Sequence, residues 1–84
     1  MNSQAEHQFT IRGETHRLSR AKVEDCMRGE EPNRISKYYV AVNGVNYPVK
    51  QVLAKCSSLQ PIAFTSMDAY RVLHKLGFQI LPPG

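Results

Sequence analysis

The clearest pattern in the chain is a pair of alternating apolar and polar runs on either side of Asn43-Gly44. Successive side chains of a strand point to opposite faces, so residues 38–42 predict one strand and residues 45–47 predict its partner. Asn-Gly readily takes the two positive φ angles of a type I′ turn. The pattern therefore predicts a central β-hairpin, whose second strand is cut short because Pro48 cannot donate a ladder hydrogen bond.

Two apolar stripes with helical spacing follow this hairpin. In each stripe the apolar positions recur at i, i+3, i+4 and i+7, which predicts two short helices that bury one side. Thr65 and Asp68 have the spacing of a capping box before the second helix, and Gly77 is placed to end that helix with a left-handed cap. A short closing strand is expected over residues 78–81. The stripes consist of Val49, Val52, Leu53 and Cys56, and then of Ala69, Val72, Leu73 and Leu76.

The first third of the chain predicts an accessory layer. Gly13 separates two short runs that contain apolar residues, and its conformational freedom favours the tight turn of an N-terminal hairpin. Ser19 can accept a hydrogen bond from a free first-turn amide, so we expect a helix that begins there and ends before Gly29. Residues 1–7 are polar and are expected to be frayed.

Together these elements predict one α+β domain over residues 1–84, with residues 38–80 as its core module. A chain of 84 residues buries a modest core and has no room for a large enclosed cofactor pocket. In the linker between the two later helices, Ile62 and Phe64 are expected to pack into this core. The predicted core consists of Ile11, Val23, Val40, Val42, Val52, Leu53, Phe64, Val72, Leu73, Leu76 and Phe78.

Cys26 and Cys56 are the only cysteines in the sequence. They lie thirty residues apart at apolar-face positions, with no companion Cys or closely spaced His to complete a zinc site. We interpret both as small buried hydrophobes rather than as metal ligands or a disulfide. No run approaches the roughly 18 apolar residues of a membrane span, and the first residues lack the apolar core of a signal peptide. We therefore expect a reduced, cytoplasmic protein with no membrane or metal partner.

The positive charge of the chain is concentrated in its second half. Residues 1–32 hold five basic and six acidic side chains, whereas residues 33–84 hold six basic side chains and only Asp68 as an acid. A polyanionic partner should therefore meet the second half.

Catalysis has little support in the sequence. General acid–base or nucleophilic chemistry needs titratable groups that lie together, but His7, His16 and His74 are scattered. The chain has no glycine-rich phosphate loop and no nucleophile elbow. We predict a protein that is not an enzyme and that uses no cofactor.

DNA binding is the function with positive support. On the exposed side of the second predicted helix, Arg71 is suited to read guanine with two hydrogen bonds. Lysines on both helices are suited to contact phosphates without reading sequence. The predicted DNA contacts are Lys50, Lys55, Thr65, Ser66, Arg71 and Lys75.

A protein-interaction module, acting as a small adaptor or regulator, is the alternative function. The central hairpin exposes a strand edge unless the closing strand or the N-terminal hairpin covers it, and such edges recruit strands of partner proteins. Apolar Val45 and Ile62 would extend an interaction surface of this kind. The sequence leaves the choice between the two functions open.

A further clue is the combination of residues 47–52, with the sequence YPVKQV, residues 64–66, with the sequence FTS, and residues 73–78, with the sequence LHKLGF. This combination resembles a small module attached to HNH-type restriction endonucleases that act on modified DNA, where it is often N-terminal and is called a head domain. The resemblance spans residues 38–80 and implies a DNA-associated setting, such as defence against foreign or modified DNA. The 84 residues contain no nuclease half, so the resemblance implies a reader module without cutting activity, either free-standing or excised from a larger protein.

Overall fold

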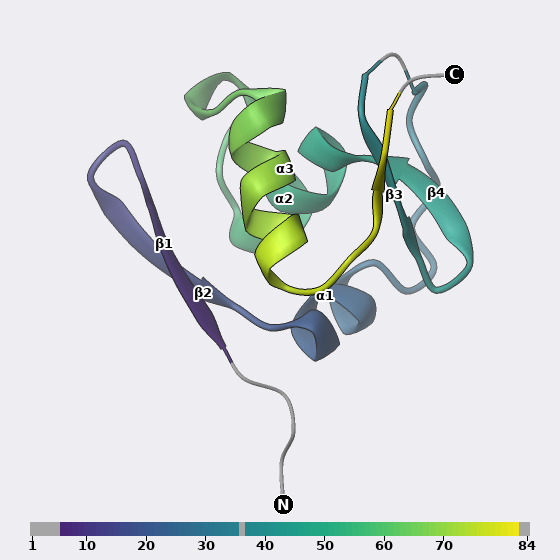
Figure 1. The fold of residues 1–84 in the computed structure, drawn as a ribbon, viewed down its shortest axis with the longest axis horizontal. Helices are drawn as coiled ribbons and strands as arrows, with labels where there is room; N and C mark the ends of the chain where they lie inside the picture. Colours follow the sequence, from purple (N-terminus) through teal and green to yellow (C-terminus); the bar gives the residue numbers. More distant parts are fainter. Residues whose placement is uncertain (1–5, 36, 83–84) are drawn as a thin grey trace, which may run out of the picture.

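The computed structural model describes residues 6–35 and 37–82 and confirms a small α+β domain (Figure 1). Within these residues the strands form two antiparallel sheets, a hairpin of β1 and β2 and a sheet in the order β4-β3-β5. The predicted frayed segment falls largely on residues outside the described ranges, whereas His7 is the first residue of β1. The elements are β1 (His7–Ile11), β2 (Glu14–Leu18), α1 (Arg20–Cys26), β3 (Tyr39–Val42), β4 (Val45–Pro48), α2 (Val49–Ser57), the 3₁₀ turn η1 (Pro61–Ala63), α3 (Ser66–Lys75) and β5 (Ile80–Leu81).

Both predicted hairpins are present and turn in the same way. Asn43 and Gly44 have φ angles of 55° and 80°, which are the two positive angles that a type I′ turn requires. Arg12 and Gly13 repeat this geometry between β1 and β2, with φ angles of 52° and 79°. β5 pairs with the other side of β3, so β3 is the central strand of its sheet and the closing strand covers the edge that the sequence left open.

The predicted helix ends are also confirmed. The Ser19 hydroxyl accepts the Lys22 N–H at 3.1 Å at the start of α1. Before α3, the Thr65 hydroxyl accepts the Asp68 N–H at 3.1 Å and the Asp68 carboxylate accepts the Thr65 N–H at 3.0 Å, which completes the capping box. After α3, Gly77 has a φ of 94° and the Phe78 N–H donates to the Leu73 carbonyl at 3.2 Å, as in a Schellman motif.

With the exception of Ile62, the residues predicted to form the core are buried, and Tyr47 is one of several further residues that the structure adds to them. The Tyr47 side chain is 2% exposed, and its hydroxyl donates to the Glu30 carbonyl at 2.8 Å. The same hydroxyl lies 3.3 Å from the Met27 carbonyl. Tyr47 thus ties the central hairpin to the connector that follows α1 and supplies a donor to the partly buried Glu30 carbonyl.

The expectation that Ile62 packs into the core is wrong. Ile62 is 86% exposed, whereas Phe64, two residues later, is 4% exposed and buried as predicted. The η1 turn carries the chain outward between α2 and α3, so its central residue points into solvent and only the residue that leaves the turn reaches the core.

The two cysteines form a disulfide, which corrects their interpretation as unbonded hydrophobes. α1 packs against α2, and the Cα atoms of Cys26 and Cys56 lie 5.8 Å apart, within the range that a disulfide spans. Both side chains remain partly buried against the core, as their apolar-face positions indicated. The sequence pattern could not show that these two faces meet, because they lie on helices separated by the whole central hairpin.

Within the described part of the chain, no helix combines the length and the apolar character needed to cross a membrane. Among the same residues, no group of three or more His, Cys, Asp or Glu side chains is arranged to hold a metal ion.

Candidate functional site

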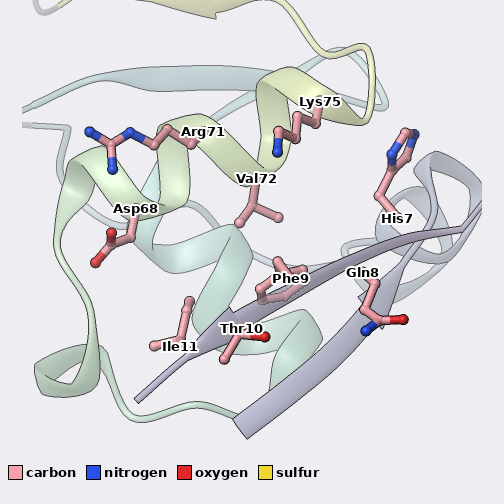
Figure 2. A pocket seen from close by; sticks show the side chains of 9 residues that line it. All are labelled: His7, Gln8, Phe9, Thr10, Ile11, Asp68, Arg71, Val72 and Lys75. Carbon is pink, nitrogen blue, oxygen red and sulfur yellow. The ribbon is translucent and has the colours of Figure 1, made fainter. Parts of the chain in front are cut away.

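An open groove of about 410 Å³ lies between β1 and α3 (Figure 2). We call it the β1–α3 groove. All five residues of β1 line it, together with four residues spaced along α3, which places two elements far apart in the sequence side by side. The lining residues are His7, Gln8, Phe9, Thr10, Ile11, Asp68, Arg71, Val72 and Lys75.

The floor of the groove is apolar and its rim is polar. Phe9 from β1 and Val72 from α3 point toward one another across the floor, and Lys75 extends from α3 toward β1 (Figure 2). Arg71 lies at the rim. At the tip of the hairpin, the Arg12 guanidinium donates to the Ala63 carbonyl at 3.1 Å. This contact fastens the hairpin to η1, just before α3, and so helps to hold the two walls in place.

The two cations of the groove are not neutralised by neighbouring acids. Among the described residues, Arg71 and Lys75 form no ion pair, although both are exposed and lie four residues apart on α3. Asp68 also lines the groove, but its carboxylate accepts the Thr65 N–H in the capping box. The groove therefore presents two cations that are available to an anionic ligand.

Two further side chains of α3, Tyr70 and His74, belong to a different surface. Tyr70 packs edge-on against Tyr38, with ring centroids 5.1 Å apart, and His74 stacks on Tyr70 at 5.9 Å. These three rings connect α3 to the segment just before β3. They support the helix from the side that does not face β1.

A second hollow, on the surface of α2, contains the predicted contacts Lys50 and Lys55. We call it the α2 hollow. The Lys50 ammonium lies 5.4 Å from the centre of the Phe64 ring, and the Lys55 ammonium lies 3.4 Å from a Glu30 carboxylate oxygen. Both lysines are thus engaged within the protein. The hollow is also lined by Asn33, Arg34, Pro48, Gln51, Ala54 and Pro61.

The structure divides the six predicted contacts among three places. Arg71 and Lys75 both line the β1–α3 groove, and Lys50 and Lys55 line the α2 hollow. Thr65 and Ser66 stand at the start of α3, where the Thr65 hydroxyl is used as a cap. The predicted set is therefore not one continuous site.

The β1 wall of the groove was missed from the sequence. The pattern of Phe9 and Ile11 after Gln8 predicted an N-terminal hairpin strand, and this was the only signal available. It could not show that the strand lies against α3, because the placement depends on the tertiary contacts of the hairpin with α2 and η1.

A family model described as SCO5918-like matches residues 10–82. The chain belongs to the SCO5918-like family. Within this SCO5918-like chain, the matched range contains all of α3 and the last two residues of β1. No curated protein and no solved structure matches it significantly.

Proposed function

We propose that this protein is a non-catalytic nucleic-acid-binding module that contacts DNA through the unpaired cations of its second half. Arg71 and Lys75 are the leading contacts. Lys50, Thr65 and Ser66 are secondary contacts on neighbouring surfaces, and Lys55 contributes least because Glu30 already neutralises it.

The observation that carries the proposal is the pair of unpaired cations on α3. Arg71 and Lys75 lie about one helical turn apart on an exposed helix face, so both can reach one phosphate backbone. Basic side chains that already have acidic neighbours lose much of their attraction for a polyanion. Those neighbours are present for Arg20, Lys22, Arg28 and Lys55, but not for Arg71 and Lys75 among the described residues.

The two cations are suited to different contacts. The Arg71 guanidinium is a planar fork that can donate two parallel hydrogen bonds to a phosphate or to a guanine edge. Lys75 is a point charge that attracts phosphate without geometric selectivity. We propose that Lys75 supplies affinity and that Arg71 supplies affinity together with orientation.

The setting is part of the same proposal. The resemblance of residues 38–80 to the head modules of HNH-type restriction endonucleases supports a DNA-associated task, such as defence against foreign or modified DNA. We also retain the prediction of a cytoplasmic location. Because cytoplasmic thiols are kept reduced, DNA binding should be measured both with the Cys26–Cys56 bond formed and with it reduced.

The test is a titration of fluorescent duplex and single-stranded DNA at several salt concentrations, read by anisotropy. Affinity should fall as salt rises, because every phosphate contact releases condensed counterions. Each lost phosphate contact should reduce the salt slope of duplex binding by about 0.9. Arg71→Ala and Lys75→Ala should each weaken binding, and the double variant should weaken it most.

Two matched controls separate the proposed site from net charge. Arg28→Ala removes the same charge from an exposed position in the turn after α1, where Arg28 pairs with Asp25 at 3.5 Å. Lys55→Ala removes a lysine that pairs with Glu30. Both should weaken binding less than their groove counterparts. Absence of binding at low salt, or equal effects of Arg71→Ala and Arg28→Ala, contradicts the proposal.

A further inference from the structure

The outer edge of β1 is an unpaired strand edge. Arg12 and Gly13 form a two-residue type I′ turn, so the flanking Ile11 and Glu14 form a hydrogen-bonded pair. Because hydrogen-bonded and non-hydrogen-bonded pairs alternate along an antiparallel ladder, the backbone N–H and C=O groups of Gln8 and Thr10 point away from β2. Among the described residues, the sheet contains only β1 and β2, so these groups have no strand partner.

This free edge faces the β1–α3 groove. One face of a strand presents only alternate residues, yet five consecutive residues of β1 line the groove, which indicates that it runs along the edge. Figure 2 shows β1 lying between α3 and β2. The groove therefore begins where a third strand of this sheet would lie.

The chemistry of the groove selects an extended peptide as the occupant. A strand edge offers N–H donors and C=O acceptors in alternation, and a peptide backbone satisfies both. A phosphate backbone only accepts hydrogen bonds, so it would meet the Gln8 and Thr10 carbonyls with repulsion. The apolar floor of Phe9 and Val72 suits apolar side chains at alternate positions of the incoming strand.

The charge of the peptide follows from the opposite wall. Arg71 and Lys75 form no ion pair among the described residues, and both belong to the α3 wall of the groove. A segment with Asp or Glu between its apolar residues would complement them, whereas a basic segment would be repelled. We propose that the β1–α3 groove binds an extended acidic segment of a partner protein, which adds to β1 as a third strand.

The proposed docking has one consequence that rests on the proposed function. An acidic strand in the groove would cover Arg71 and Lys75 and would therefore compete with DNA. Docking itself does not depend on DNA binding, so the two proposals can fail separately.

The test uses a fluorescein-labelled peptide of nine alternating Glu and Val residues. We expect saturable binding by anisotropy, weakened by Arg71→Ala. Two control peptides test the two proposed sources of affinity, which are charge complementarity and backbone pairing with β1. In one, Lys replaces Glu, and in the other, alternate backbone amides are N-methylated so that the strand cannot pair. Neither control should bind measurably. Absence of binding by the acidic peptide, or equal binding of the N-methylated peptide, overturns the proposal.

A variant of β1 tests the edge directly. Thr10→Pro removes the outward N–H, and proline is tolerated on strand edges whose N–H faces solvent. It should weaken peptide binding about fivefold to tenfold, as expected for one lost hydrogen bond. Thr10→Ala loses the same side chain but keeps the N–H, so the proline variant should bind the peptide more weakly than the alanine variant does. Equal affinity of the proline variant and the wild type contradicts strand addition.

Hydrogen exchange on the wild-type protein gives an answer that does not depend on how a variant folds. The Gln8 and Thr10 amides should exchange rapidly in the free protein and slowly with saturating peptide. Unchanged exchange overturns the proposal. The same peptide is then titrated into the DNA complex. Displacement of DNA by the peptide supports competition. If the protein keeps its affinity for DNA while the peptide is bound, competition is contradicted but peptide docking is not.

Discussion

The two halves of the molecule use their charges in opposite ways. Each of the four ion pairs of Lys or Arg among the described residues contains a carboxylate from the first half of the chain, and three of the four also take their cation from that half. The second half contributes one cation, Lys55, to these pairs. Its other basic side chains form no ion pair among the described residues, although Lys50 lies over the Phe64 ring. The uneven distribution of charge in the sequence therefore persists in the fold. The carboxylates of the first half pair with cations other than those of α3, so the α3 cations are not neutralised.

The two sheets differ in a related way. β3 is paired on both sides, by β4 and β5, whereas β1 is paired on one side only within the described residues. In the sheet of the second half, both edges of the central strand β3 are therefore covered by neighbouring strands. The hairpin of the first half leaves an edge beside the cations of the second half, so the candidate site is shared between the halves.

The largest expected effect tests whether the two halves fold as one unit. Leu53 is fully buried on α2, which packs against α1, α3, β2 and β4. Leu53→Ala should lower the free energy of unfolding by about 3 to 5 kcal/mol, through lost burial and the cavity left behind. Urea unfolding followed by circular dichroism measures the change. Ile62→Ala is the control, since an exposed side chain should cost less than about 0.5 kcal/mol. If β1 and β2 stay protected from hydrogen exchange in Leu53→Ala, the halves are independent.

The second effect concerns the covalent connection between the halves. The Cys26–Cys56 bond joins α1 to α2 across thirty residues of sequence. Its removal in a Cys26→Ala, Cys56→Ala double variant should lower the free energy of unfolding by about 2 to 4 kcal/mol, because the unfolded chain gains freedom. Reductant should destabilise the wild type and leave the double variant unchanged. A wild type that is indifferent to reductant would show that the bond does not restrain the unfolded chain.

The third effect concerns the hydrogen bonds that cross between the halves. Tyr47→Phe removes the hydroxyl that donates to the Glu30 carbonyl and leaves this partly buried acceptor without its side-chain donor. The free energy of unfolding should fall by about 1 to 2 kcal/mol. Tyr39→Phe, on the neighbouring strand, is the matched control and should change stability little, because no hydrogen bond of its hydroxyl is present among the described contacts. Equal effects of the two changes would assign the loss to general packing.

The smallest effect lies within the first half. The Lys22 ammonium hydrogen-bonds to the Glu6 carboxylate and holds the pKa of Glu6 below its ordinary value. Since the pKa is lower in the folded than in the unfolded state, the pair stabilises the fold at neutral pH, and this contribution is lost as the pH falls through the folded-state pKa. Glu6→Gln should therefore be slightly less stable than the wild type at neutral pH and equally stable in acid. Both side chains are exposed, so the difference is small. A gap that widens in acid would contradict the pairing.

Much of the fold could be predicted because its signals are local. The φ angles at Asn43-Gly44, the capping box of Thr65 and Asp68, and the left-handed Gly77 depend on residues within a few positions of one another. The core was also predictable, because helical and strand periods identify the buried side of each element before its partner is known.

What only the tertiary structure decided is which of these elements meet. Cys26 and Cys56 could be assigned to apolar helix faces, but their bond depends on the packing of α1 against α2. Ile62 and Phe64 are both apolar in one linker, and only the path of η1 exposes the first and buries the second. Arg71 and Lys75 were identified by their charge, whereas the β1 wall opposite them is created by contacts across more than fifty residues, such as that of Arg12 with Ala63, separated by 51 positions. Sequence periodicity reports the environment of one element at a time, and a site built between two elements arises only when the chain has folded.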